Sequence, residues 1–158
     1  MAVELLRIDD RLIHGQVVEG WLPHLKAEHV VVLVNHKDEV AEALMRMAMP
    51  PAVSLEIVPA AGAAAALASG PAKAKRTLVL VPGPAEALSL LEGGLAVTRV
   101  NVGGLHYTAG KVQLGKALFL DAADRKALAG IAARGVSLEG RALPGDPAED
   151  VAAALGSA

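Results

Sequence analysis

Apolar residues recur along this chain in short runs, which alternate with longer segments that mix apolar and polar positions. Five of the runs are rich in Val, Leu and Ile and have the length of β-strands. They cover Val3–Ile8, Val30–Val34, Val53–Val58, Leu78–Val81 and Arg99–Val102. The second and fourth runs are apolar at every position, which is typical of strands covered by helices on both faces.

The segments between these runs have the composition and apolar spacing of helices. They are His14–Leu25, Lys37–Met49, Ala60–Ser69 and Pro84–Leu91. The alternation of strand and helix predicts an α/β fold with a doubly wound, mostly parallel sheet. We expect a single domain over residues 1–158, with about six to seven strands and helices on both faces of the sheet.

The alternation becomes less regular after residue 103. In chain order we expect a hairpin or bent strand from Lys111–Gln113 and Ala117–Leu120, a helix over Asp121–Arg134, an edge strand over Val136–Leu143 and a short helix over Asp146–Leu155. Asp121 is the expected N-cap of the longer helix, and Gly135 is its expected C-terminal stop.

Composition excludes several classes of function. The formal net charge of −2 lacks the basic excess that a general nucleic-acid surface needs. Cysteine is absent, so disulfides and thiolate metal sites are excluded. The histidines and acids show no spacing typical of a zinc site, and neither a metal nor a cofactor is expected. Apolar runs fall short of the roughly 20 residues that span a bilayer, and no signal peptide is visible, so we expect a soluble cytoplasmic protein.

Polar side chains concentrate in the loops that follow the predicted strands. Ligands of open α/β sheets bind at the carboxyl ends of the strands, so these loops are the candidate site. The loops after the first, second and fifth strands carry most of the chemistry: Asp9, Asp10, Arg11, His14 and Gly15; Asn35, His36 and Lys37; and Gly103, Gly104 and His106.

His14 is the candidate for covalent chemistry. It lies at the expected start of a helix, where free N–H groups and the helix dipole disfavour a cation, so the imidazole should stay neutral and nucleophilic. Arg11 offers a planar guanidinium for phosphate oxygens, and Gly15 permits close approach to the backbone. Asp9 or Asp10 would orient the imidazole or brace Arg11. These groups suit a phosphoryl acceptor, yet they equally fit a helix-capping histidine beside a surface ion-pair cluster.

The segment Arg7–Val18, which reads Arg-Ile-Asp-Asp-Arg-Leu-Ile-His-Gly-Gln-Val-Val, resembles a known signature. It is similar to that of the IIB subunits of the bacterial sugar phosphotransferase system (PTS), in the mannose/fructose/sorbose family. Further similar positions follow in order: Gly20-Trp21, Met47–Pro51, Asn101–Gly104, Gly110-Lys111, Gln113, Lys116-Ala117 and Gly135-Val136. The resemblance therefore covers nearly the whole chain.

The resemblance implies a phosphoryl relay. A IIA protein, itself charged by the phosphocarrier HPr, would pass a phosphoryl group to His14, and the phosphohistidine would give it to a sugar entering through membrane IIC and IID subunits. The chain would thus be a protein-N(pi)-phosphohistidine–sugar phosphotransferase component, with Arg11 as the neighbouring phosphate-binding residue and no metal. Because phosphoryl transfer depends mainly on positioning and charge, Asn35 and Lys37 are further candidates, and Gly103-Gly104 would line the site.

Two loops depart from the family pattern. The second is often acidic where this chain has Asn35-His36-Lys37, and the fifth commonly reads Gly-Gly-Met-Ser/Arg-Tyr where this chain has Gly103–Tyr107. The sugar therefore stays open, as does the oligomeric state, including a homo-oligomer. The chain starts directly at the IIB motif, so we expect its IIA to be a separate protein. We also expect it to associate peripherally with the membrane permease.

Two other classes of protein fit parts of the sequence. A receiver-like signalling domain needs an Asp after the third strand and a Lys after the fifth, where this chain has Pro59-Ala60 and Gly103-Gly104. That class is excluded. A non-catalytic regulatory or binding protein that retains the IIB fold remains the alternative, and the intact first motif counts against it.

Overall fold

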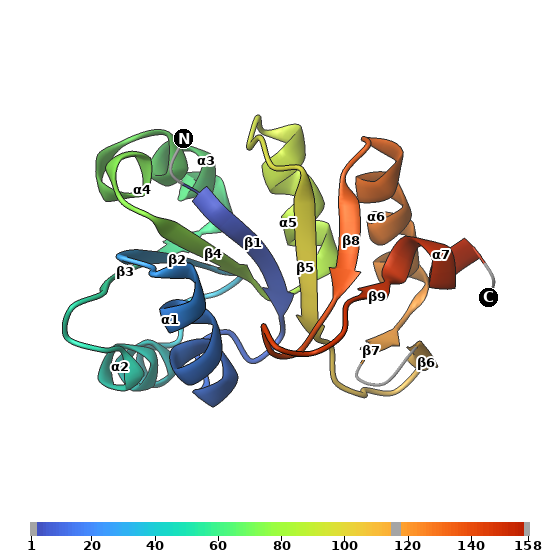
Figure 1. The fold of residues 1–158 in the computed structure, drawn as a ribbon, viewed down its shortest axis with the longest axis horizontal. Helices are drawn as coiled ribbons and strands as arrows, with labels where there is room; N and C mark the ends of the chain where they lie inside the picture. Colours follow the sequence, from blue (N-terminus) through green and yellow to red (C-terminus); the bar gives the residue numbers. More distant parts are fainter. Residues whose placement is uncertain (1–2, 115–117, 157–158) are drawn as a thin grey trace.

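The computed structural model describes residues 3–114 and 118–156, which pack around a seven-stranded sheet of order β3-β2-β4-β1-β5-β8-β9 (Figure 1). The strands of this sheet are β1 Val3–Asp9, β2 His29–Val34, β3 Ser54–Pro59, β4 Thr77–Val81, β5 Arg99–Gly104, β8 Ser137–Gly140 and β9 Glu149–Asp150. Only β9 among them is antiparallel to its neighbour. The predicted mostly parallel α/β sheet is confirmed.

The helices connect these strands and match most of the predicted segments. They are the π-helix η1 Gln16–Trp21, then α1 Leu22–Leu25, α2 Glu39–Ala48, α3 Ala60–Ala68, α4 Gly70–Ala74, α5 Pro84–Glu92, α6 Ala122–Ala133 and α7 Val151–Gly156. The predicted boundaries of α6 are confirmed, because Asp121 forms a capping box with Asp124 and Gly135 adopts a left-handed φ of 81°.

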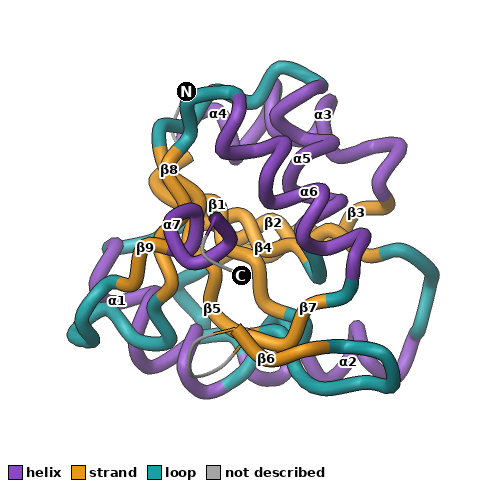
Figure 2. The backbone as a smooth tube through the Cα atoms, turned by 90° about the vertical axis from the view of Figure 1, so that its right-hand side faces the viewer, coloured by secondary structure: helices purple, strands orange, loops and turns teal. Residues whose placement is uncertain are grey.

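The order of the strands explains why helices cover both faces of the sheet. From β1 the chain moves through β2 to β3 at one edge, and then returns through β4 to β5 and β8. Right-handed crossovers in opposite directions place their helices on opposite faces. Accordingly α1 and α2 lie on one side of the sheet and α3 to α6 on the other, as Figure 2 shows. The carboxyl ends of β1 and β5 meet at one edge.

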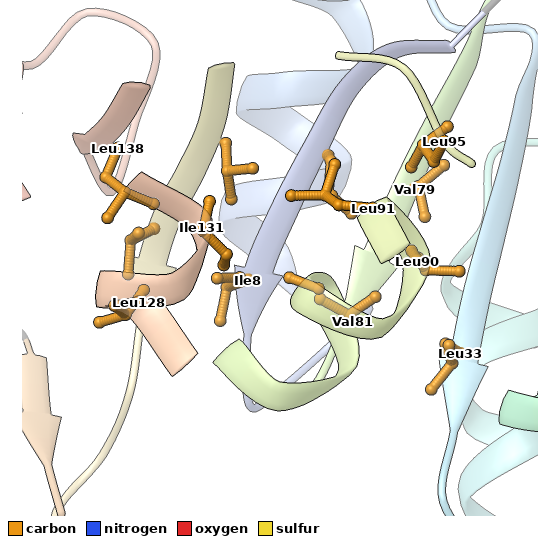
Figure 3. Packing of buried hydrophobic residues seen from close by; sticks show 14 of the residues in the cluster. Ile8, Leu33, Val79, Val81, Leu90, Leu91, Leu95, Leu128, Ile131 and Leu138 are labelled. Carbon is orange, nitrogen blue, oxygen red and sulfur yellow. The ribbon is translucent and has the colours of Figure 1, made fainter. Parts of the chain in front are cut away.

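Alternate residues of each strand pack on opposite faces of the sheet. Leu6 and Ile8 join the core under α3 to α7, whereas Leu5 joins the core under η1, α1 and α2. Figure 3 shows Leu90 and Leu91 of α5 packed over the strands in the core under α3 to α7. Each side chain buried in this way contributes about 2 kcal/mol relative to its exposed state. The aliphatic runs of the sequence therefore hold the sheet in place.

The first helical segment differs from the prediction, and an additional helix follows the third. The expected helix His14–Leu25 is divided into a π-helix and a single α-helical turn. Pro23 has no N–H to donate to the carbonyl of Glu19, so the α-helical hydrogen-bond pattern cannot continue there. The third segment, predicted over Ala60–Ser69, is observed as α3 Ala60–Ala68. The short helix α4 that follows was not predicted; it begins at Gly70 with a φ of 58°, and Pro71 lies in its first turn.

The C-terminal elements are shorter than predicted. The expected strand Val136–Leu143 ends at Gly140, and β9 rather than β8 forms the edge of the sheet. The last helix begins at Val151 rather than at Asp146, because the Asp150 side chain accepts a hydrogen bond from the Ala153 N–H.

The predicted hairpin is present as two short antiparallel strands, β6 Val112–Leu114 and β7 Leu118–Leu120. Residues 115–117, which include the predicted strand residue Ala117, lie outside the described residues.

Candidate functional site

A tight turn after β1 returns the chain so that His14 lies against Asp9. The Leu12 N–H donates to the Asp9 carbonyl at 3.1 Å, and Leu12 itself has a left-handed φ of 58°. Such a conformation is unfavourable for a residue other than glycine. The turn is followed by η1, so His14 lies at the start of a helix, as the sequence predicted.

The His14 ring is fixed by one hydrogen bond. Its Nε2 atom lies 2.8 Å from Oδ2 of Asp9. The Asp9 side chain is fully buried, and the His14 side chain is 13% exposed. Since a carboxylate only accepts hydrogen bonds, Nε2 carries the proton and Nδ1 carries the lone pair of the neutral ring. The Nδ1 atom is itself buried, and it has no hydrogen-bond partner among the described residues.

The Asp9 carboxylate remains ionised despite its burial. Its Oδ2 atom accepts a hydrogen bond from Arg7 Nη2 at 3.0 Å, and its Oδ1 atom accepts one from the Arg11 backbone N–H at 3.0 Å. Burial alone raises the pKa of Asp9, but the hydrogen bond from His14 and the charge of Arg7 outweigh it. The pKa of Asp9 therefore lies below its usual range.

Arg7 is a residue of the candidate site that sequence reasoning missed. Its side chain is fully buried, and it donates to the Asn101 side chain and to the carbonyls of Arg141 and Ala142, the latter two at 3.0 and 3.1 Å. Burial lowers its pKa and the Asp9 charge opposes that shift, but an arginine stays protonated at neutral pH. The available signal was a charged residue inside the apolar run of β1.

Gly103 provides the space for Arg7. A Cβ atom at Gly103 would lie 2.1 Å from the Arg7 Cζ atom, far inside contact distance. On the η1 side the Arg7 guanidinium lies 5.1 Å from the centre of the Trp21 ring. Trp21 Nε1 also donates to the Ala142 carbonyl at 2.8 Å. The segment after β8 is thereby fastened to both β1 and η1.

Arg11 lies on the exposed side of the turn. Its Nη2 atom donates to Oε1 of Gln16 at 3.0 Å. Beside it, the space at the Cβ position of Gly15 is open, with nothing within 4 Å. A group approaching this open side meets the exposed Arg11 side chain and the start of η1.

Asp10 and His106 form a second acid–histidine pair. Asp10 Oδ1 lies 2.6 Å from Nδ1 of His106, and Asp10 Oδ2 accepts the His106 backbone N–H at 2.6 Å. The Asp10 N–H in turn donates to the Gly104 carbonyl at 3.1 Å. The predicted residues of the first and fifth loops are therefore joined, although no pairing between them was predicted.

The structure does not bring Asn35 and Lys37 to His14. The Asn35 side chain donates to Glu86 at 3.0 Å, and Lys37 pairs with Glu42 at 3.6 Å. Strand β2, which they follow, is separated from β1 by β4. Asn35 and Asp10 both line a cleft of about 210 Å³.

Within residues 3–114 and 118–156, no group of three or more histidines and acids is placed to hold a metal ion. No helix in these ranges has the length and apolar character required to cross a membrane.

The chain matches a family model described as "PTS system sorbose subfamily IIB component" over residues 3–158. It is 32% identical to the sorbose-specific EIIB component of Lacticaseibacillus casei, with 98% of this chain and 96% of that protein covered. It is also 34% identical to the mannose-specific EIIAB component of Escherichia coli K12, over 93% of this chain but only 46% of that protein. The chain thus spans about half the length of the EIIAB protein.

Solved structures agree with these similarities. The IIBSor domain of the sorbose permease from Klebsiella pneumoniae superimposes with a TM-score of 0.91 at 32% identity, covering 99% of this chain and 98% of that one. Fold and sequence therefore define an open α/β protein of the sugar phosphotransferase system. The chain belongs to the sorbose subfamily of IIB components.

Proposed function

We propose that this protein is a cytoplasmic phosphoryl carrier, a single domain that accepts a phosphoryl group on His14 from phosphorylated IIA. It then passes the group to a sugar imported through membrane IIC and IID subunits. Membership of the IIB family supports this role, and the EIIAB name of the Escherichia coli relative supports IIA as the partner. The observation that carries the proposal is the His14 geometry, with Nε2 held by Asp9 and Nδ1 uncommitted.

The acceptance step follows from this geometry. The Nδ1 lone pair attacks phosphorus while the bond to the IIA donor breaks and its electron pair leaves with the donor. The proton stays on Nε2, where the Asp9 carboxylate stabilises the positive charge that the ring gains. Arg7 keeps that carboxylate ionised and in place.

The phosphoryl oxygens need positive partners on the open side of the turn. Arg11 is exposed there, and among the described residues its guanidinium donates only to Gln16, so it can turn to the phosphoryl group. Gly15 leaves room for the approach. Asn35 and Lys37 stay outside this proposal, since their contacts lead to Glu86 and Glu42.

A transfer experiment with ³²P-labelled phospho-IIA tests the proposal. The wild-type chain should become labelled, and the phosphorus should be found on Nδ1 of one histidine by ³¹P and ¹⁵N NMR. His14→Ala should take up no label, because the nucleophile is gone. His36→Ala, which removes an exposed histidine of the neighbouring loop, should be labelled like the wild type.

Arg11→Ala should be labelled at least about tenfold more slowly, with an unchanged circular dichroism spectrum. Label on the His14→Ala protein would refute the assignment. A folded wild-type chain that takes no label from phospho-IIA would favour the alternative, a binding protein that retains the IIB fold.

A further inference from the structure

The Asp10–His106 pair fixes a second imidazole at the edge of the site. Asp10 holds both the backbone N–H and the Nδ1–H of His106, at 2.6 Å each. This double contact orients a ring whose side chain is 56% exposed. Because the carboxylate accepts the Nδ1 proton, the lone pair of the neutral ring lies on Nε2. That Nε2 atom has no hydrogen-bond partner among the residues that the structure describes.

The pair lies beside the His14 group, with Gly104 between them. The Cβ position of Gly104 is 3.6 Å from Cε1 of His106 and 3.8 Å from Oδ1 of Asp9. The Asp9 carboxylate also binds His14. These are ordinary contact distances, so the gap between the His106 ring and Asp9 at Gly104 is about as wide as one methyl group. The exposed His106 ring therefore borders the carboxylate that holds His14.

Delivery of a phosphoryl group to a sugar requires a base, because the sugar hydroxyl loses its proton. The other basic groups beside His14 are already engaged. Asp9 accepts hydrogen bonds from His14, Arg7 and the Arg11 backbone, and Asp10 accepts both bonds from His106. His36 also lies at this edge, but among the described residues no carboxylate holds its ring.

We propose that His106 is the general base of the second half-reaction, and that Asp10 is its positioning residue. This inference rests on the proposed phosphoryl transfer through His14. The sugar O–H bond breaks and its proton moves to Nε2 of His106, while the hydroxyl oxygen forms the new bond to phosphorus. The bond from phosphorus to Nδ1 of His14 breaks, and its electron pair returns to the ring. The arrangement is that of other phosphoryl transfers in which a positioned base accepts the hydroxyl proton.

The two half-reactions can be measured separately. Charging is the uptake of ³²P from phospho-IIA, and discharge is the single-turnover formation of labelled sugar phosphate. Discharge uses membrane vesicles containing the IIC and IID partners and a mixture of mannose, fructose and sorbose. His106→Asn keeps an amide N–H that can reach Asp10 but has no basic atom at the Nε2 position. It should be charged within about twofold of the wild-type rate and discharged about 100-fold more slowly.

Asp10→Asn tests the positioning role. An amide N–H facing Nδ1 moves the ring proton to Nε2 and removes the lone pair from the acceptor side. The ¹⁵N chemical shifts of the His106 ring should show the proton on Nε2 instead of Nδ1. Discharge should slow about as much as in His106→Asn, while charging continues. His36→Gln is the matched control, and it should change neither rate.

Discharge of His106→Asn within about threefold of wild type would overturn the inference while leaving the His14 relay intact. Equal slowing of charging and discharge would also overturn it, because it would assign His106 to general phosphate binding. An Asp10→Asn chain with the exchanged tautomer and normal discharge would remove Asp10 from the mechanism. A wild-type chain that is not charged at all would contradict the proposed function itself.

Discussion

The Asp9 carboxylate is both a partner in a buried ion pair and the group that orients His14. It is fully buried and carries hydrogen bonds from His14, Arg7 and Arg11. Taking one partner from a buried ion pair is costly, because the other charge is left uncompensated. Orienting His14 through Asp9 therefore requires a buried negative charge, and the Arg7 guanidinium compensates that charge.

Asp9→Asn should change how the protein responds to acid. The pKa of Asp9 is lowered in the folded state, so its stabilisation is present above about pH 4 and is lost as the pH falls through the folded pKa. The variant should be roughly 3 kcal/mol less stable at pH 7, and the difference should shrink towards pH 3. Urea unfolding followed by circular dichroism measures it.

Glu92→Gln, at an exposed position near the end of α5, is the control and should follow the wild-type curve at every pH. If the difference between Asp9→Asn and wild type stayed constant from pH 7 to pH 3, the ionised Asp9 would not be the source of the stabilisation.

At the scale of elements, β5 is shaped around the side chain of its neighbour β1. Asp9 of β1 pairs in register with Gly104 of β5, and a register shift lies just before it. Gly103 leaves the space that the Arg7 guanidinium fills. The buried guanidinium of β1 therefore contacts both β5 and the segment after β8. The π-helix η1 completes the enclosure through Trp21.

The adjacent glycines of β5 offer a matched pair of substitutions. Gly103→Ala places a methyl group on the Arg7 guanidinium and should cost about 3 kcal/mol or more, because Arg7 must leave Asp9. Gly104→Ala meets only ordinary contacts of 3.6 and 3.8 Å and should cost less than about 1 kcal/mol. Urea unfolding of both variants measures the difference, and equal stability would show that Arg7 does not depend on Gly103.

At the scale of the whole molecule, the carboxyl and amino ends of the parallel strands have different roles. The candidate site lies at the carboxyl edge, where β1 and β5 end. At the amino edge, His29 and Ser54 begin β2 and β3. The buried His29 ring contacts Ser54 Oγ at 2.6 Å and Glu56 Oε1 at 2.8 Å. This cluster ties the edge strand β3 to the sheet, well away from His14.

His29→Leu should therefore lower stability without changing the chemistry. The loss of two hydrogen bonds is expected to cost about 1–3 kcal/mol in urea unfolding. The rate of ³²P transfer from phospho-IIA should stay within about twofold of wild type at a temperature where the variant is folded. His36→Leu, an exposed substitution after β2, serves as the control and should alter neither quantity. A large loss of rate in a fully folded His29→Leu protein would contradict this separation of edges.

The periodic pattern was enough to predict the parallel sheet, its strands and the set of loops that meet at one edge. Aliphatic runs and caps such as Asp121 act locally, so they can be recognised without the fold. The C-terminal region was less well predicted, because β9 forms only by pairing with β8 and a strand of two residues has no periodicity. The break in the first helix depends on Pro23, whose effect on helix type was not foreseen.

The sequence by itself determined the order of the elements and the loop that holds His14, since both depend on residues near one another in the chain. The tertiary structure decided which groups act together. It joined Arg7 to Asn101 and Arg141, joined Asp10 to His106 across 96 residues, and directed Asn35 to Glu86. These contacts arise where strands distant in sequence become neighbours, and hydrogen bonds act only over such short distances. Local patterns therefore cannot specify them.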